Sequence, residues 1–150
     1  MNLSFEKWHG AKNNFIVCHL VENDDLLLES LKKNTSKLCT NDGSGIGADG
    51  ILILLYENIK ELYPSELIIL NSDGSFAKTC GNGIRCAASS LHNRLSENGA
   101  SSVDIIELNV SDRNYTCRFD KSGIVNINMG PCLANDDLEN YEEINFQRRF

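Results

Sequence analysis

The stretch that decides the fold is residues 71–95, NSDGSFAKTCGNGIRCAASSLHNRL, in which a turn and a short connection lead into a helix. A helix is predicted over residues 83–95 because small and aliphatic side chains recur along one helical stripe. That stripe consists of Ile84, Ala87, Ala88 and Leu91. A stripe of this kind is typical of a helix that buries one face.

Cys80 lies just before the predicted helix, and Gly81 and Gly83 follow it. The first N–H groups of a helix lack intrahelical partners and carry partial positive charge, so they stabilise a thiolate and bind a carboxylate. Glycines at this position allow the backbone to approach a ligand closely. A cysteine before a helix is also commonly a small buried core residue. Local physics therefore leaves both a catalytic and a packing role open for Cys80.

The rest of the chain is predicted to consist mainly of strands. Alternating or β-branched apolar runs predict strands at residues 3–9, 15–21, 51–56, 66–70, 103–110, 115–119 and 124–129. Leucines near helical spacing after an acidic start predict a helix over about residues 24–38. Strands outnumber helices, and the sequence contains no long internal repeat. We therefore expect an α+β fold.

Composition limits what the protein can be. Its 150 residues, with 41% hydrophobic and 23% charged side chains, suit one packed domain. A formal net charge of −7 has the wrong sign for binding nucleic acid through its phosphates. The sequence lacks the apolar run of a membrane-spanning segment and the pattern of a signal peptide, so we expect a cytoplasmic protein with reduced cysteines. The expected domain covers residues 1–130, and the polar residues 131–150 resemble the start of a linker.

Residues 45–50, GIGADG, match the G-x-G-x-x-G pattern of dinucleotide-binding loops. That pattern needs a strand before it and a helix after it, so that the pyrophosphate lies on the helix N-terminus. Here the predicted order is helix, loop and strand. We therefore interpret this segment as a tight glycine loop and expect no nucleotide cofactor.

The six cysteines include no C-x-x-C pair and no histidine spaced to complete a zinc site, so no metal is expected. Cys86 follows Cys80 by six residues. This separation corresponds to about 240° around a helix, so Cys86 is predicted to face the core. Cysteines inside predicted strands are also expected to pack, namely Cys18 and Cys117. Two cysteines beside loops stay unassigned, namely Cys39 and Cys132.

Four segments together resemble the diaminopimelate epimerase family. They are HGAKNNF at residues 9–15, GIGADG at 45–50, NSDGSFAKTCGNGIRC at 71–86 and VNINMGP at 125–131. The third is the most specific, because N-x-D-G-S followed by C-G-N-G-x-R-C at this spacing is the family's active-site signature. The resemblance implies one lobe, the N-terminal one, of a two-lobed fold in which a curved mixed and antiparallel sheet wraps around the helix at residues 83–95.

By this resemblance, Cys80 is one of two catalytic cysteines that flank the substrate α-carbon, one removing the α-proton and the other supplying a proton to the opposite face. The backbone of Gly81 and Asn82 would contact the substrate α-carboxylate, and the side chains of Asn13 and Asn71 would also bind substrate. No pyridoxal phosphate or metal takes part in that reaction. The implied function is epimerisation of LL- to meso-diaminopimelate in lysine and cell-wall precursor biosynthesis.

The chain departs from the family's pattern in two ways. The family usually reads H-G-L-G-N-D-F in the first segment, whereas this chain has Lys12 for the second glycine and Asn14 for the aspartate. Family members are also about as long again, with a second lobe that supplies the opposite cysteine. The resemblance therefore predicts that this chain holds half of a site and that the isolated chain is inactive. A second lobe is the expected partner of the chain beside a small amino-acid substrate, and a homodimer is also allowed.

Several alternatives stay open at this point. The changes at Lys12 and Asn14 allow a related racemase or isomerase that acts on another amino acid. A proline or hydroxyproline racemase usually carries histidine where this chain has Asn82, and a phenazine-type isomerase lacks the catalytic cysteine. The alternative from another class is a non-catalytic binding domain that keeps the loop without a partner lobe.

Overall fold

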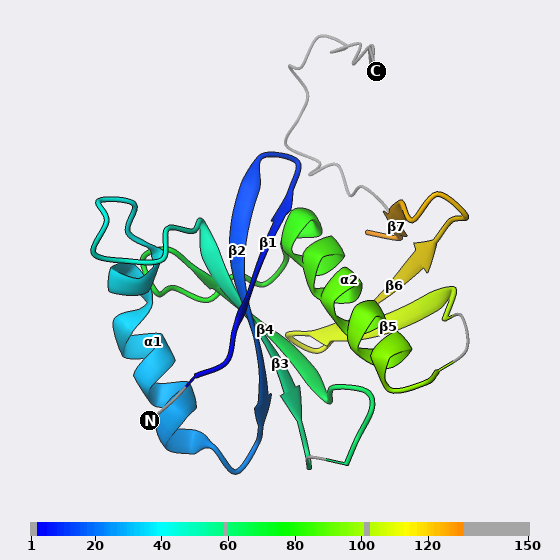
Figure 1. Ribbon diagram of the computed structural model, residues 1–150, viewed down its shortest axis with the longest axis horizontal. Coiled ribbons are helices and arrows are strands. Elements are labelled where there is room, and N and C mark those ends of the chain that lie inside the picture. The colour runs from blue at the N-terminus through cyan, green and yellow to red at the C-terminus, as the bar shows by residue number, and fades with distance from the viewer. Residues whose placement is uncertain (1–2, 59, 101–102, 131–150) are drawn as a thin grey trace, which may run out of the picture.

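Two sheets and two helices build the part of the chain that the computed structural model describes, residues 3–58, 60–100 and 103–130 (Figure 1). In chain order the elements are β1 (Glu6–Gly10), β2 (Asn13–Val21), α1 (Asp25–Cys39), β3 (Gly50–Tyr56), β4 (Glu66–Asn71), α2 (Gly81–Glu97), β5 (Ile105–Val110), β6 (Arg113–Phe119) and β7 (Val125–Ile127). Each predicted helix and strand is present in the predicted order. The α+β class is therefore confirmed.

The larger sheet has the strand order β1-β2-β3-β4, and β2 and β3 run parallel while the other two pairs are antiparallel. Helix α1 is the crossover that the parallel pair requires. Every residue of β3 is buried, because successive side chains point to opposite faces and both faces are covered. Ile51 and Ile53 pack toward α1, whereas Leu52 and Leu54 join the core around α2.

Helix α2 lies between this sheet and the antiparallel sheet β5-β6-β7 (Figure 1). The predicted stripe Ile84, Ala87, Ala88 and Leu91 is fully buried. Its small residues allow the strands to approach the helix closely, and both sheets contribute side chains to the same core. The helix therefore holds its N-terminal end, with Cys80, in a fixed place between two sheets.

The element boundaries differ in part from the predicted ones. Helix α2 begins at Gly81 instead of Gly83, because the Cys80 side chain caps the first turn and two glycines are tolerated there. The first and last strands are shorter than predicted, since β1 begins at Glu6 and β7 ends at Ile127. The predicted linker at 131–150, with Cys132, lies outside the described residues. In the described part of the chain, no helix is long and apolar enough to cross a membrane.

Candidate active site

Cys80 is the N-cap residue of α2, with an extended backbone (φ −157°, ψ 97°). Its Sγ atom accepts a hydrogen bond from the backbone N–H of Gly83 over 3.4 Å, and its carbonyl oxygen accepts one from Ile84 N over 2.8 Å. The thiol is half-buried and is not in a disulfide. Cys80 is therefore a free, accessible thiol held in one orientation by the first turn of a helix.

Two backbone donors stand beside this thiol. The N–H groups of Gly81 and Asn82 have no hydrogen-bond partner among the described residues, as is usual for the first positions of a helix. The partial positive charge of the helix N-terminus adds to their preference for an anion. Met129 borders this position, since a Cβ atom built on Gly81 would lie 3.7 Å from its sulfur. The local chemistry suits a carboxylate placed next to a thiol.

Asn13 and Asn82 meet at the same end of the molecule although 69 residues separate them in the sequence. Asn13 begins β2, and its Oδ1 atom accepts a hydrogen bond from Asn82 Nδ2 over 2.9 Å. The guanidinium of Arg85 donates to Asn82 Oδ1. The structure therefore joins the side chains of two predicted substrate-binding residues, Asn13 and Asn82, although Asn82 was predicted to contact substrate through its backbone. It also adds Arg85, which the sequence interpretation did not single out.

Asn71 has a different environment. It ends β4 opposite Gly50, and its side chain is exposed. Asn71 Nδ2 donates to Ser75 Oγ over 2.9 Å, and Asn71 N donates to Ser75 O over 2.8 Å. The amide is thus used inside the 71–75 turn, and no hydrogen bond among the described residues joins it to Asn13, Asn82 or Cys80.

Two further residues fix the backbone around these asparagines. The Asp49 carboxylate accepts a hydrogen bond from Asn14 N over 2.7 Å, and Asp49 N donates to Asn14 O over 2.7 Å. On the other side of Cys80, Tyr115 donates its hydroxyl proton to Thr79 Oγ1 over 2.9 Å. Sequence reasoning missed both contacts, since each joins residues at least 35 positions apart.

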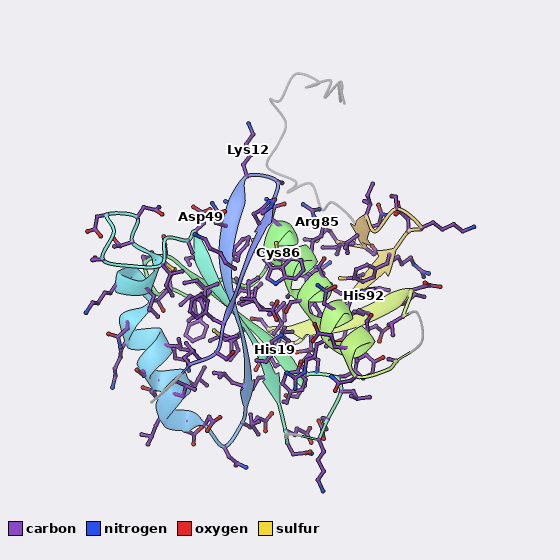
Figure 2. All side chains as sticks on the ribbon, in the orientation of Figure 1. Lys12, His19, Asp49, Arg85, Cys86 and His92 are labelled. Atoms are coloured by element: carbon purple, nitrogen blue, oxygen red, sulfur yellow. The ribbon has the colours of Figure 1, made fainter. Side chains whose placement is uncertain are left out.

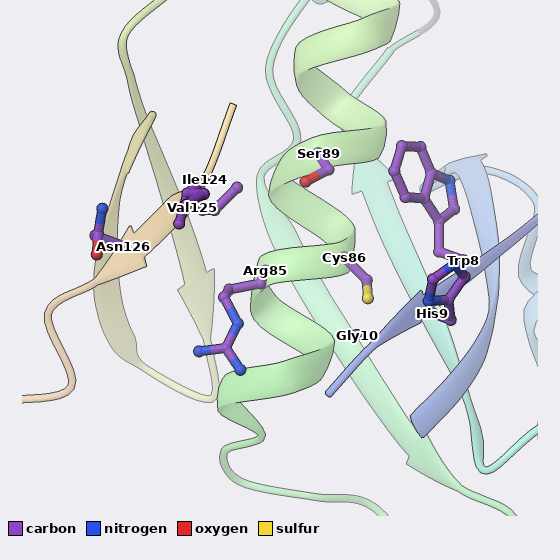
Figure 3. A pocket seen from close by; sticks show the side chains of 9 residues that line it. All are labelled: Trp8, His9, Gly10, Arg85, Cys86, Ser89, Ile124, Val125 and Asn126. Carbon is purple, nitrogen blue, oxygen red and sulfur yellow. The ribbon is translucent and has the colours of Figure 1, made fainter. Parts of the chain in front are cut away.

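A groove of about 380 Å³ runs beside α2 from β1 to the segment around β7 (Figure 3). It is lined by Trp8, His9, Gly10, Arg85, Cys86, Ser89, Ile124, Val125 and Asn126. The missing side chain of Gly10 lets β1 pass close to the helix, because a Cβ atom there would lie 3.1 Å from Cys86 Sγ. In Figure 3, Arg85 and Cys86 leave the helix toward opposite sides, Arg85 toward β7 and Cys86 toward β1.

Comparison with known proteins identifies the family of this site. The model of the family described as diaminopimelate epimerase matches residues 5–132. The chain belongs to the diaminopimelate epimerase family. It is 37% identical over 149 residues to a diaminopimelate epimerase of Clostridium perfringens, covering 91% of this chain and 51% of that relative. It is 36% identical to one of Halothermothrix orenii, covering 92% of this chain and 47% of that relative.

The fold is also similar to a solved structure, the Bacillus anthracis phenazine biosynthesis protein of the PhzF family. The two share 12% sequence identity and superpose with a TM-score of 0.50, over 83% of this chain and 38% of that one. This likeness concerns the fold alone. The chain spans about half the length of the diaminopimelate epimerases that it matches.

The other described cysteines of this family member are core residues, as predicted for Cys86, Cys18 and Cys117. Burial raises the pKa of Cys86 to about 11, that of Cys18 to about 12 and that of Cys117 to about 11. Cys39, which the sequence left unassigned, is also buried, and burial raises its pKa. These thiols stay protonated at neutral pH. Cys80 is therefore the accessible thiol among the cysteines of the described residues.

The glycine loop at 45–50 has the structural context predicted for it. Helix α1 precedes the loop and β3 follows it, the reverse of the dinucleotide-binding order. A Cβ atom on Gly45 would lie 2.4 Å from the carbonyl oxygen of Lys37, and Gly47 has a φ of +77°. The interpretation of this segment as a tight loop is confirmed. Within the described residues, no cluster of three or more His, Cys, Asp or Glu side chains is arranged to hold a metal ion.

Proposed function

We propose that this chain carries one half of an amino-acid epimerase site in which Cys80 exchanges the proton on the substrate α-carbon. The observation that carries the proposal is the accessible Cys80 thiol at the N-cap of α2, beside the free N–H groups of Gly81 and Asn82. A substrate whose α-carboxylate binds these N–H groups brings its α-carbon next to the Cys80 sulfur. Asn13 and Asn71 would contact the same substrate from the ends of β2 and β4.

The proposed reaction needs two thiols. The Cys80 thiolate removes the α-proton, the C–H electron pair stays on carbon as a carbanion, and a thiol on the opposite face donates its proton to that carbon. The product is the inverted stereoisomer, and the second sulfur is left as the thiolate. For the reverse reaction the two thiols exchange roles. The helix N-terminus offsets the negative charge that develops next to the carboxylate.

The second thiol must come from outside the described residues, because the other cysteines there are buried and protonated. Relatives about twice as long as the matched region support a second lobe as its source. The substrate that we propose is diaminopimelate, in its LL and meso forms, for a cytoplasmic lysine and cell-wall precursor pathway. The chemistry uses thiols and backbone donors, with no pyridoxal phosphate or metal, as the family resemblance implies.

The test compares the isolated chain with a hybrid that joins residues 1–130 to the part of the Clostridium perfringens relative that lies outside the match. Both proteins are first shown to fold by a cooperative thermal transition, and they are then incubated with LL-diaminopimelate in D₂O. We expect the hybrid to form meso-diaminopimelate with deuterium at the α-carbon and the isolated chain to form none. A folded hybrid without this product contradicts the proposed function, and rapid conversion by the isolated chain contradicts the half-site.

A further inference from the structure

Arg85 lies one helical turn after Asn82 on α2 and donates its hydrogen bond to Asn82 Oδ1. Asn82 Nδ2 donates in turn to Asn13 Oδ1 over 2.9 Å. The oxygen and nitrogen of an asparagine amide have nearly the same shape, so an amide pair by itself is stable in either direction. A guanidinium differs from an amide because it has five donors and no acceptor.

We propose that Arg85 is a positioning residue that sets the direction of the hydrogen-bond chain running from Arg85 through Asn82 to Asn13. This direction leaves Asn13 Nδ2 as a donor for the substrate carboxylate. Since only an oxygen can face Arg85, the Asn82 NH₂ group must face Asn13, and Asn13 must accept with Oδ1. Asn13 Nδ2 has no partner among the described residues. This inference rests on the proposed function for its ligand.

If the hydrogen bonds ran in the opposite direction, Asn13 Oδ1 would point toward the incoming carboxylate. The Asn13 oxygen and the carboxylate oxygen would then face each other without a proton between them and would repel each other. Arg85 prevents this reversal, and its charge also polarises the Asn82 amide toward stronger donation. The guanidinium is available for this role because the Lys33–Glu29 ion pair and the close His19–Glu6 contact of the described residues do not involve it. The availability of Asn13 Nδ2 as a hydrogen-bond donor therefore depends on Arg85, which is neither the thiol residue nor one of the free N–H groups at the helix N-terminus.

The test uses the full 150-residue chain and two substitutions, Arg85→Met and Arg85→Lys, with Arg94→Met as the matched control on the same helix. Arg94 stacks on the Tyr56 ring and is not part of the amide chain. Side-chain amide signals of Asn13 and Asn82 are followed by ¹⁵N NMR, with nuclear Overhauser contacts between them and their rates of solvent exchange. The chain is then titrated with meso-diaminopimelate, and the shifts of the same signals are followed.

We expect Arg85→Met to abolish the Asn82–Asn13 amide contact and the slow exchange of the Asn82 amide protons. Ligand binding should weaken about tenfold to hundredfold, the size of one lost hydrogen bond to a charged group. Arg85→Lys, which also has donors only, should restore most of the amide contact and most of the ligand affinity. Arg94→Met should leave the contact and the affinity unchanged. The proposal is overturned if Arg85→Met keeps the Asn82–Asn13 contact, or loses it and binds the ligand equally well. If the unsubstituted chain binds no ligand without its second lobe, the Asn82–Asn13 amide contact alone decides the role of Arg85, and the activity of the hybrid decides the proposed function.

Discussion

Replacing His19 by glutamine should remove a large part of the pH dependence of folding. His19 lies on β2 with a side chain that is only 12% exposed. Its Nδ1 atom is 2.8 Å from the Tyr56 hydroxyl, and its Nε2 atom is 2.9 Å from Ser90 Oγ. Ser90 in turn donates to Glu6 Oε2 over 3.0 Å. Because Ser90 gives its proton to Glu6, Ser90 Oγ can only accept from His19, so His19 Nε2 carries a proton. His19 Nδ1 accepts from the Tyr56 hydroxyl, which makes the imidazole neutral.

Burial, together with the nearby positive charge of Arg94 and partly offset by the Glu6 carboxylate, lowers the pKa of His19 from 6.5 to about 4. The unfolded chain therefore binds a proton at His19 between about pH 6.5 and 4 that the folded chain does not bind. Stability from this group is complete above about pH 6.5 and is lost progressively as the pH falls from about 6.5 to about 4. At about 1.4 kcal/mol per pH unit, the loss between about pH 7.5 and 4.5 is about 2–3 kcal/mol.

The assay is urea unfolding followed by circular dichroism at about pH 7.5 and 4.5. His19→Gln keeps a donor near Ser90 but does not titrate, so its stability should fall by about 2–3 kcal/mol less than that of the unsubstituted chain over this range. His92→Gln is the control for a histidine-to-glutamine substitution as such. It removes an imidazole that is stacked on Phe119 and is not part of the hydrogen bonds joining His19, Tyr56, Ser90 and Glu6. Equal losses in the unsubstituted chain and in His19→Gln would refute the assignment of a buried neutral histidine.

Two further predictions concern the scaffold of the site. Leu91→Ala should lower the free energy of unfolding by about 3 kcal/mol, because Leu91 is fully buried in the core where α2 meets both sheets; a loss below about 1 kcal/mol in urea unfolding would contradict this packing. Lys12→Gly should raise stability by about 0.5–1 kcal/mol, because Lys12 has a φ of 74° in the β1–β2 turn and projects into solvent (Figure 2). Lys12→Ala removes the same charge but keeps the Cβ atom, so a thermal shift equal to that of Lys12→Gly would show that backbone strain is not the cause.

The order and type of the elements could be predicted from the sequence because local periodicity determines them. The stripe of α2 and the apolar runs of β2 and β3 are local signals, and the burial of Ile84 and Leu91 follows from the stripe. The pairing of the strands is not a local signal. The sequence therefore did not distinguish the parallel β2–β3 pair, the separation into two sheets or the placement of α2 between them.

The candidate site was predictable only in part, for a related reason. Cys80 at a helix start and the two following N–H groups are sequence neighbours, so the motif alone places them together. Arg85 is three residues from Asn82 and could have been found from helical spacing, since positions three apart share a face. The contact of Asn82 with Asn13, by contrast, joins residues 69 positions apart, and only the folded chain brings them together.

The central claim, that the Cys80 thiol moves the α-proton, is tested most directly by Cys80→Ser in the hybrid protein. Serine is a favourable N-cap, so its hydroxyl can accept the Gly83 N–H bond and the fold is retained while the thiol is lost. The measurement is the initial rate of deuterium incorporation from D₂O at the α-carbon of LL-diaminopimelate, with Cys86→Ala as the control for loss of a buried cysteine. We predict a fall of at least about 100-fold for Cys80→Ser, the usual size of a lost acid–base group, and a rate close to normal for Cys86→Ala. A Cys80→Ser hybrid that exchanges deuterium at the unsubstituted rate would contradict the account.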